Sequence, residues 1–133
     1  MDQLEAELHI DNYQIFRADS KRKKNKHRRF GGGAALYIRD DIAASAKQIL
    51  DFSNNAVEVL CIHSTKENIC IATVYRQPDD SLHGRPSTDK EFKAALRKLA
   101  EVINNIEGTP DLIIGGDFNL PHTNWDTYSP ASQ

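Results

Sequence analysis

The chain has 133 residues, which is the size of one domain, and its 39% hydrophobic and 27% charged residues are typical of a protein with a packed core. No apolar run is long enough for a membrane helix, and the first residues, MDQLEAELHI, carry acids where a signal peptide has basic residues and then an apolar run. We therefore expect an intracellular protein, in the nucleus or the cytoplasm, with no membrane partner. In that setting Cys61 and Cys70 are expected to be reduced, buried thiols and not zinc ligands.

The net charge of −2 conceals a strong local bias. The segment KRKKNKHRR, residues 21–29, holds seven of the 17 Lys and Arg residues and no acid, which leaves 10 basic against 19 acidic residues, a balance of −9, in the rest of the chain. Like-charge repulsion predicts an exposed basic loop within a single domain of residues 1–133. Such a loop suits a nucleic-acid backbone, a nuclear import signal or solvent, and no interleaved aromatic residue supports base stacking. The substrate contacts that the loop would supply are Lys21, Arg22, Lys23, Lys24, Arg28 and Arg29.

Four strands are predicted before the first long helix. YQIF (13–16) and FGGGAALYI (30–38) flank the basic loop, and the glycines let the backbone turn or approach a neighbour. AVEVLCIHS (56–64) and NICIATVYR (68–76) are rich in Val and Ile on both faces, which predicts an interior hairpin covered on both sides. His63, within the first of these two strands, is expected to be a core residue whose polar atoms are satisfied.

The clearest helix follows. Thr88 and Glu91 have the spacing of a capping box, and Gly108 and Pro110 end the helical pattern. Its apolar stripe consists of Phe92, Ala95, Leu96, Leu99, Val102, Ile103 and Ile106. LIIGG (112–116) then predicts a short buried strand. These elements predict an α/β layered domain. One helix cannot cover both faces of such a sheet, so either a second sheet lies opposite or the covering elements lie outside this chain, and exposed edge strands would then be prone to association.

Two polar residues follow the last apolar strand. Asp117 and Asn119 are two positions apart, so they share a side if the strand stays extended, with Phe118 turned inward. A carboxylate can bind a hard metal ion or orient a water, and an amide can donate to a phosphate oxygen. Phosphodiester hydrolysis is one interpretation. An Asx turn before Pro121 is the other, and it needs no chemistry.

The end of the strand that precedes the helix offers two more candidates. Tyr75 and Arg76 lie in VYRQP, where Pro78 stops the ladder, and a hydroxyl and a guanidinium there could both contact phosphate. A tyrosine that caps the core and an arginine in solvent are the structural alternatives. His122 could reach Asp117, although a loop role is favoured. No catalytic Ser/His/Asp set, Walker loop or cysteine nucleophile motif is present.

These segments occur in a familiar order. The chain resembles the endonuclease/exonuclease/phosphatase superfamily in three segments, IFRADS…RRFGGGAALYIRDDI, VYRQP and IIGGDFNLPHTNW. Within that superfamily it resembles the apurinic-endonuclease-like domain of non-long-terminal-repeat retrotransposons, a domain that is associated with a reverse transcriptase. The resemblance extends from about Tyr13 to Trp125. It implies a four-layered α/β sandwich, Mg²⁺-dependent hydrolysis of phosphodiesters, DNA as partner and no small-molecule cofactor.

The resemblance also implies roles for single residues. Asp117 would orient or activate the attacking water, Asn119 would hold the scissile phosphate, and Tyr75 would contact it. Gln77 departs from the proline that is usual there. The family's first metal-binding Glu and its final Asp-His pair have no match, so no metal ligand is assignable. We therefore expect a domain incomplete at both ends, weakly active or inactive alone. The alternatives are a non-catalytic nucleic-acid-binding or interaction remnant and a phosphatase-type member.

Overall fold

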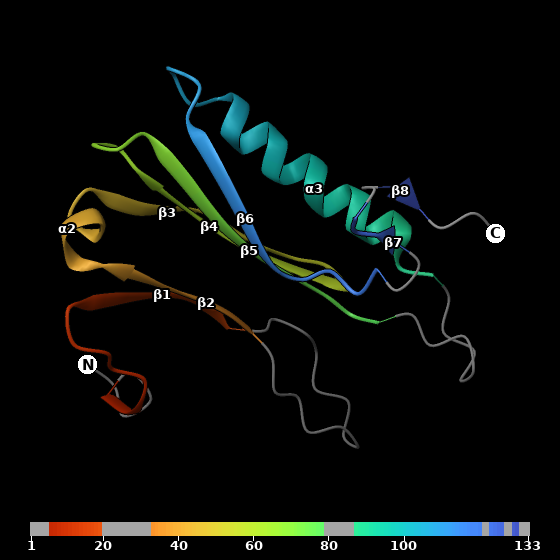
Figure 1. Ribbon diagram of the computed structural model, residues 1–133, viewed down its shortest axis with the longest axis horizontal. Coiled ribbons are helices and arrows are strands. Elements are labelled where there is room, and N and C mark those ends of the chain that lie inside the picture. Colours follow the sequence, from red (N-terminus) through yellow and green to blue (C-terminus); the bar gives the residue numbers. More distant parts are fainter. Residues whose placement is uncertain (1–5, 20–32, 79–86, 121–122, 127–128, 131–133) are drawn as a thin grey trace.

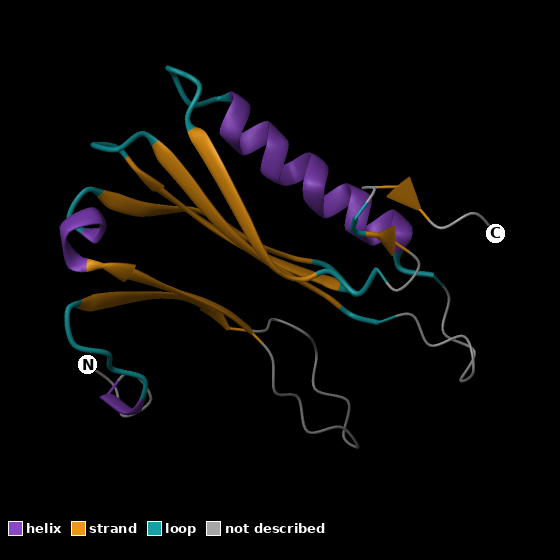
Figure 2. Ribbon diagram, viewed as in Figure 1, coloured by secondary structure: helices purple, strands orange, loops and turns teal. Residues whose placement is uncertain are grey.

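The computed structural model describes residues 6–19, 33–78, 87–120, 123–126 and 129–130. The basic loop, residues 21–29, and His122 therefore lie outside the described residues. Within them the chain forms three layers, namely a β-hairpin, a four-stranded sheet and one long helix (Figures 1 and 2). In this part of the chain no helix is long and apolar enough to cross a membrane.

The first layer is the hairpin of β1 (Tyr13–Asp19) and β2 (Gly33–Arg39). The two strands are antiparallel, and the register runs from Tyr13 opposite Arg39 to Asp19 opposite Gly33. Both strands were predicted. The short helix α2 (Asp40–Ala43) and strand β3 (Ala46–Ser53) that follow were not, because this polar segment has no simple periodicity.

The central sheet has the order β3-β4-β5-β6. Strands β4 (Val57–Ser64) and β5 (Ile69–Arg76) form the expected antiparallel hairpin, whereas β6 (Asp111–Asp117) lies parallel to β5. A parallel neighbour requires a crossover, which here is α3 (Asp89–Asn104). The sheet is therefore mixed.

The two faces of the central sheet are covered by different layers. On one face, alternate residues such as Cys61 and Val74 pack against Leu99 of α3. Apart from these layers, β7 (Thr123–Asn124) and β8 (Ser129–Pro130) form a small separate hairpin. On the other face, Leu60 packs with Phe16 of the β1–β2 hairpin. This confirms that a second sheet lies opposite, and it explains why β4 is buried at every position. The α/β class is confirmed, but the described residues show three layers and not the expected four-layered sandwich.

Two local expectations were wrong. LIIGG is not buried, because α3 packs over β3 and β4 while the hairpin packs over β4 and β5, which leaves the edge strand β6 uncovered. Leu112, Ile113 and Ile114 are 43%, 54% and 38% exposed. The capping box is also absent. Thr88 precedes the helix, but its side chain makes no capping hydrogen bond, because the hydroxyl oxygen accepts one from Arg76 instead.

The exposed apolar edge of β6 predicts self-association. Ile113→Lys places a charge on this edge, and because Ile113 is largely exposed the free energy of unfolding should change by less than about 0.5 kcal/mol. Sedimentation velocity across a concentration series should show less association. Gln48→Lys is the control, since it adds the same charge to the exposed side of the other edge strand, β3. An equal effect of both changes would assign the result to net charge instead of to β6.

The two cysteines are free and buried, as expected. Burial raises the pKa of Cys61 to about 12 from its ordinary value of 9.0. A raised thiol pKa favours the protonated folded state, so this contribution to stability is complete below about pH 9 and is lost as pH rises toward 12. We expect the urea midpoint to fall less steeply between pH 9 and 10.5 in Cys61→Val than in the wild type. Equal slopes would contradict this.

Candidate functional site

The ends of β5 and β6 bring three polar side chains into one row. Tyr75 pairs with Asp117 across the parallel ladder, and Glu58 of β4 lies opposite Tyr75 on its other side. Directly opposed residues point to the same face of a sheet, and here that is the face toward the β1–β2 hairpin. Asp117 is exposed, Tyr75 is half-buried and Glu58 is buried. The sheet alone therefore places Asp117 next to Tyr75, far apart in sequence.

A glycine makes this approach of the strands feasible. Gly116 has a φ of 143°, and a Cβ built on it would lie 2.0 Å from the carbonyl oxygen of Val74. Any other residue would push β6 away from β5 just before Asp117. The glycine that precedes the acid thus keeps the last pair of the ladder together.

The chain turns immediately after Asp117. Asn119 has a φ of 45°, and its backbone N–H donates to Oδ1 of Asp117 over 3.2 Å. This is the Asx turn that the sequence left open. The amide group of Asn119 donates from Nδ2 to the carbonyl oxygen of Arg76 over 2.6 Å. The extended backbone that would place Asp117 and Asn119 on one side of a strand does not persist, because β6 ends at Asp117.

The turn nevertheless brings both polar side chains to one hollow. This hollow has a volume of about 540 Å³ and is lined by Pro78, Gly116, Asp117, Phe118, Asn119, Leu120 and Trp125. Phe118 is turned inward, as expected, and its ring centroid lies 6.4 Å from that of Phe92 on α3. Trp125 is 56% exposed, so a large aromatic surface lies at the rim.

Arg76 does not face this hollow. Its side chain is 2% exposed, with Nε donating to Thr88 Oγ1 over 2.9 Å and Nη2 to Asp89 Oδ1 over 2.8 Å. The guanidinium carbon lies 4.9 Å from the ring centroid of Phe92. The expectation of a substrate contact by Arg76 was therefore wrong. A buried guanidinium with these partners joins β5 to the start of α3. This role could not be predicted from the sequence, because Thr88 and Asp89 are also residues that commonly cap a helix.

Glu58 was not singled out from the sequence, yet it belongs to this edge. Its side chain is 4% exposed, and Oε2 accepts a hydrogen bond from the backbone N–H of Gly33 over 3.1 Å. An acid in the otherwise apolar stretch AVEVLCIHS was the available signal. Gly33 pairs with Asp19, so the strands on either side of the basic loop end at the edge where Tyr75 and Asp117 lie. The six basic side chains themselves lie outside the described residues.

Few side-chain oxygen atoms at this edge could bind a metal ion. Within the described ranges, no group of three or more His, Cys, Asp and Glu residues could hold a metal ion. Asp117 supplies one accessible carboxylate. Mg²⁺ is commonly bound through one or two carboxylates together with substrate phosphates and waters, so this set fits an ion that arrives with a phosphate. His63 is no ligand candidate, because its Nε2 lies 3.0 Å from Oδ1 of Asn68, as expected for a satisfied core residue.

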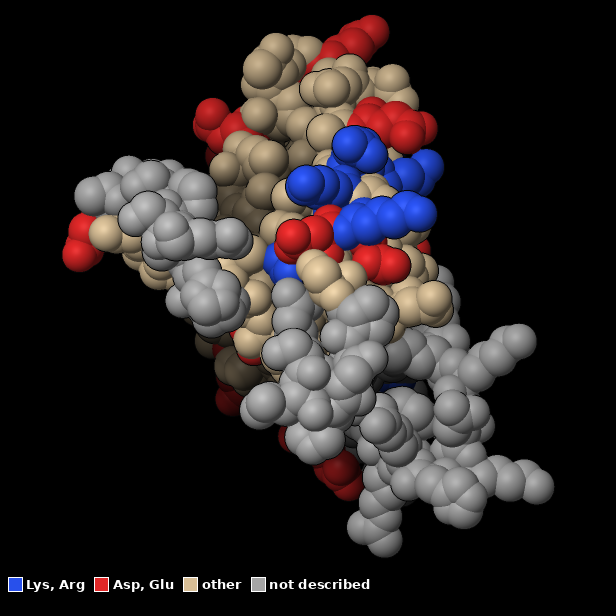
Figure 3. Space-filling view, turned by 90° about the vertical axis from the view of Figure 1, so that its right-hand side faces the viewer, with Lys and Arg blue, Asp and Glu red and all other residues tan. Residues whose placement is uncertain are grey.

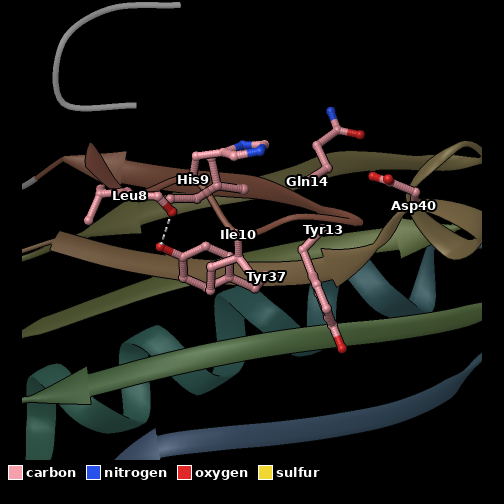
Figure 4. A pocket seen from close by; sticks show the side chains of 8 residues that line it. Leu8, His9, Ile10, Tyr13, Gln14, Tyr37 and Asp40 are labelled. Atoms are coloured by element: carbon pink, nitrogen blue, oxygen red, sulfur yellow. Dashed lines mark hydrogen bonds between the residues drawn. The ribbon is translucent and has the colours of Figure 1, made fainter. Parts of the chain in front are cut away.

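A second hollow, of about 450 Å³, lies on the outer face of the β1–β2 hairpin (Figure 4). The hydroxyl of Tyr37 donates to the carbonyl oxygen of Leu8 over 2.8 Å. His9, Gln14 and Asp40 are spread along its rim and do not converge on one point. With no convergent polar set, this hollow is a weaker candidate than the one at Asp117.

Comparison with known proteins points to the part of the chain that forms this edge of the sheet. Residues 69–133 match the family described as endonuclease-reverse transcriptase, and this range contains Tyr75, Asp117 and Asn119. No curated protein and no solved structure matches the chain. The match supports the resemblance to part of an endonuclease/exonuclease/phosphatase-type domain of retrotransposons. It indicates a nuclease function in general terms.

The Arg76–Asp89 pair should be important for stability. Asp89→Ala leaves a guanidinium that is 2% exposed without its carboxylate, so we expect a loss of about 2–3 kcal/mol, below the usual cost of breaking a buried pair because Asp89 itself is 65% exposed. Glu101→Ala on the same helix breaks a surface pair with Lys98 and should cost less than about 0.5 kcal/mol. Urea unfolding of both variants measures the difference, and equal losses would refute the assignment.

Proposed function

We propose that this chain carries part of a Mg²⁺-dependent endonuclease domain that hydrolyses phosphodiester bonds of DNA. One observation supports this most strongly. Tyr75 and Asp117 are neighbours across β5 and β6, Asn119 lines the same hollow as Asp117, and all three fall in the range matched by the endonuclease-reverse transcriptase family.

The Asx turn and a catalytic role for Asp117 are compatible. Oδ1 accepts the N–H of Asn119, which fixes the rotation of the carboxylate, and Oδ2 remains able to accept a hydrogen bond from a water in the hollow. A water held in this way is oriented for attack on phosphorus, and its proton can move toward the carboxylate. The turn thus positions the group that orients the nucleophile.

Asn119 is suited to the phosphate. One hydrogen of Nδ2 is donated to the carbonyl oxygen of Arg76, and the second can donate to a non-bridging phosphate oxygen without adding charge. The hydroxyl of Tyr75, in the row beside Asp117, can donate to another oxygen of that phosphate. Contacts from Asn119 and Tyr75 to one phosphate would stabilise the charge that grows in the transition state.

The ion would be held at Asp117 together with the substrate phosphate. When bound, Mg²⁺ supplies a positive charge that neutralises the phosphate and lowers the pKa of a coordinated water. The protein's contribution is then the orientation of that water by Asp117 and of the phosphate by Asn119 and Tyr75.

A second function, nucleic-acid binding without cleavage, is favoured by one observation. Asp117 is the one carboxylate that lines the hollow among the described residues, and no second acid or base lines it there to protonate the leaving group. Binding through phosphate contacts would survive such a deficit.

The proposal is tested by nicking of supercoiled plasmid with Mg²⁺ and with a chelator. Asp117→Asn keeps an oxygen acceptor for the turn but removes the charge, so we expect nicking to fall by about 10²–10⁴-fold with little change in the unfolding midpoint. Asp111→Asn, an equal change at the exposed opposite end of β6, should nick like the wild type. Nicking by Asp117→Asn at the wild-type rate would refute the site.

The same plasmid assay distinguishes the two functions. A nuclease nicks with Mg²⁺ and stops with chelator, whereas a binding protein retains DNA in both conditions and leaves the plasmid supercoiled. Binding without nicking in the wild type would therefore select the second function.

A further inference from the structure

Glu58 lies at the inner end of the row that contains Tyr75 and Asp117. It is opposite Tyr75 across β4 and β5, and Tyr75 is opposite Asp117 across β5 and β6. Side chains that face each other in this way have Cβ atoms about 5 Å apart, so Glu58 is the neighbour of Tyr75 on the side away from Asp117. Glu58 is only 4% exposed and does not line the hollow. Any role of Glu58 in the proposed reaction must therefore act through other residues.

Glu58 also joins the central sheet to the β1–β2 hairpin. Its Oε2 accepts a hydrogen bond from the backbone N–H of Gly33 over 3.1 Å. Gly33 begins β2 and pairs with Asp19 at the end of β1, and its φ of 138° is a backbone conformation that residues with a side chain rarely adopt. In Figure 1 the open end of this hairpin points toward the side of the molecule at which β5 and β6 end. The hydrogen bond therefore holds the residues that flank segment 20–32 close to Tyr75.

Packing alone does not require an acid at this position. Leu60 and Ile62 are the next residues of β4 on the same face, and both pack against the hairpin as core residues. An apolar side chain at position 58 could pack in the same way, and replacing a buried charged group by an apolar one is often neutral or stabilising. A carboxylate, unlike an aliphatic side chain, can accept a backbone N–H. The acid is thus explained by the position of Gly33 that it maintains.

The position of Gly33 matters because the positive charge of this protein is concentrated in one segment. Residues 21–29 hold seven of the 17 Lys and Arg residues and no acid. On the side of the molecule where β5 and β6 end, Lys and Arg side chains of the described residues lie directly beside Asp and Glu side chains (Figure 3). Such a mixed surface has little preference for a polyanion. Phosphate contacts near the hollow would then depend on where the basic segment joins the fold.

We infer that Glu58 is a positioning residue for DNA binding, which holds Gly33 so that the basic segment 21–29 joins the fold beside Tyr75 and the hollow at Asp117. The inference rests on the proposed action on DNA and deepens it, since it names the residue that links the basic segment to the site. Glu58 acts through its hydrogen bond to Gly33 and not through its charge.

The test compares two substitutions that remove the same charge. Glu58→Gln keeps a side-chain oxygen that can accept the N–H of Gly33, whereas Glu58→Met keeps the length of the side chain without that oxygen. Glu58→Leu replaces Glu58→Met if the latter does not fold, as judged by the unfolding midpoint. Hydrogen exchange of the Gly33 amide, followed by NMR, reports whether the anchor is retained. Binding of a labelled DNA duplex is measured at about 50–200 mM salt with a chelator present, and plasmid nicking is measured separately with Mg²⁺.

In Glu58→Met we expect faster exchange of the Gly33 amide and the loss of one or two phosphate contacts. The slope of log K against log salt should then fall in magnitude by about 0.9–1.8, and binding at 0.15 M salt should weaken by about 5- to 30-fold. Nicking should fall by a similar factor at low plasmid concentration and recover at saturation, since loss of binding raises KM and leaves kcat unchanged. Glu58→Gln should remain close to the wild type in every measurement.

Equal DNA binding by Glu58→Gln and Glu58→Met would overturn the inference, because the two variants differ in the acceptor for Gly33 and not in charge. A wild-type chain that does not bind duplex DNA would overturn it as well. If the wild type binds DNA but does not nick the plasmid, the nuclease proposal fails, and the difference in binding between the two variants still decides the role of Glu58.

Discussion

Buried Arg76 connects the three parts of the molecule that meet at the candidate site. Its guanidinium holds Thr88 and Asp89 at the start of α3, and its carbonyl oxygen accepts the amide of Asn119. An arginine in the interior is stable only with such partners, since removing a guanidinium from water is costly. The same residue therefore fixes where the helix begins and where the loop after β6 lies. Without its side chain, Phe92 would lose the cation above its ring, and the start of α3 would lose its hydrogen bonds to β5.

The parallel pairing of β5 and β6 has two opposite consequences. It places the ends of both strands at one edge, so Tyr75 and Asp117 become neighbours. It also leaves β6 as the last strand of the sheet, with Ile113 more than half exposed. In the described residues α3 packs mainly on β3 and β4, and the hairpin mainly on β4 and β5. The position that creates the site is thus also the least protected part of the fold.

The loop after β6 shows that a structural and a chemical interpretation of the same residues can both hold. The Asx turn occupies one oxygen of Asp117 and orients the amide of Asn119, and each side chain keeps one further polar atom that can act on a substrate. Gly116 contributes by its close approach to Val74, where a side chain would collide with the backbone. Local backbone geometry therefore prepares the groups that the proposed chemistry needs.

The sequence by itself determined the elements with strong local signals. The Val- and Ile-rich strands β4 and β5, the apolar stripe of α3 and the buried thiols follow from composition and periodicity. The order of the motifs indicated the resemblance that the family match over residues 69–133 supports. Only the tertiary structure decided that Arg76 is buried, that Thr88 serves Arg76 instead of its own helix, and that LIIGG is exposed. These outcomes depend on which elements pack over which strand. Periodicity shows that a surface is apolar, but what covers that surface is a property of the whole fold.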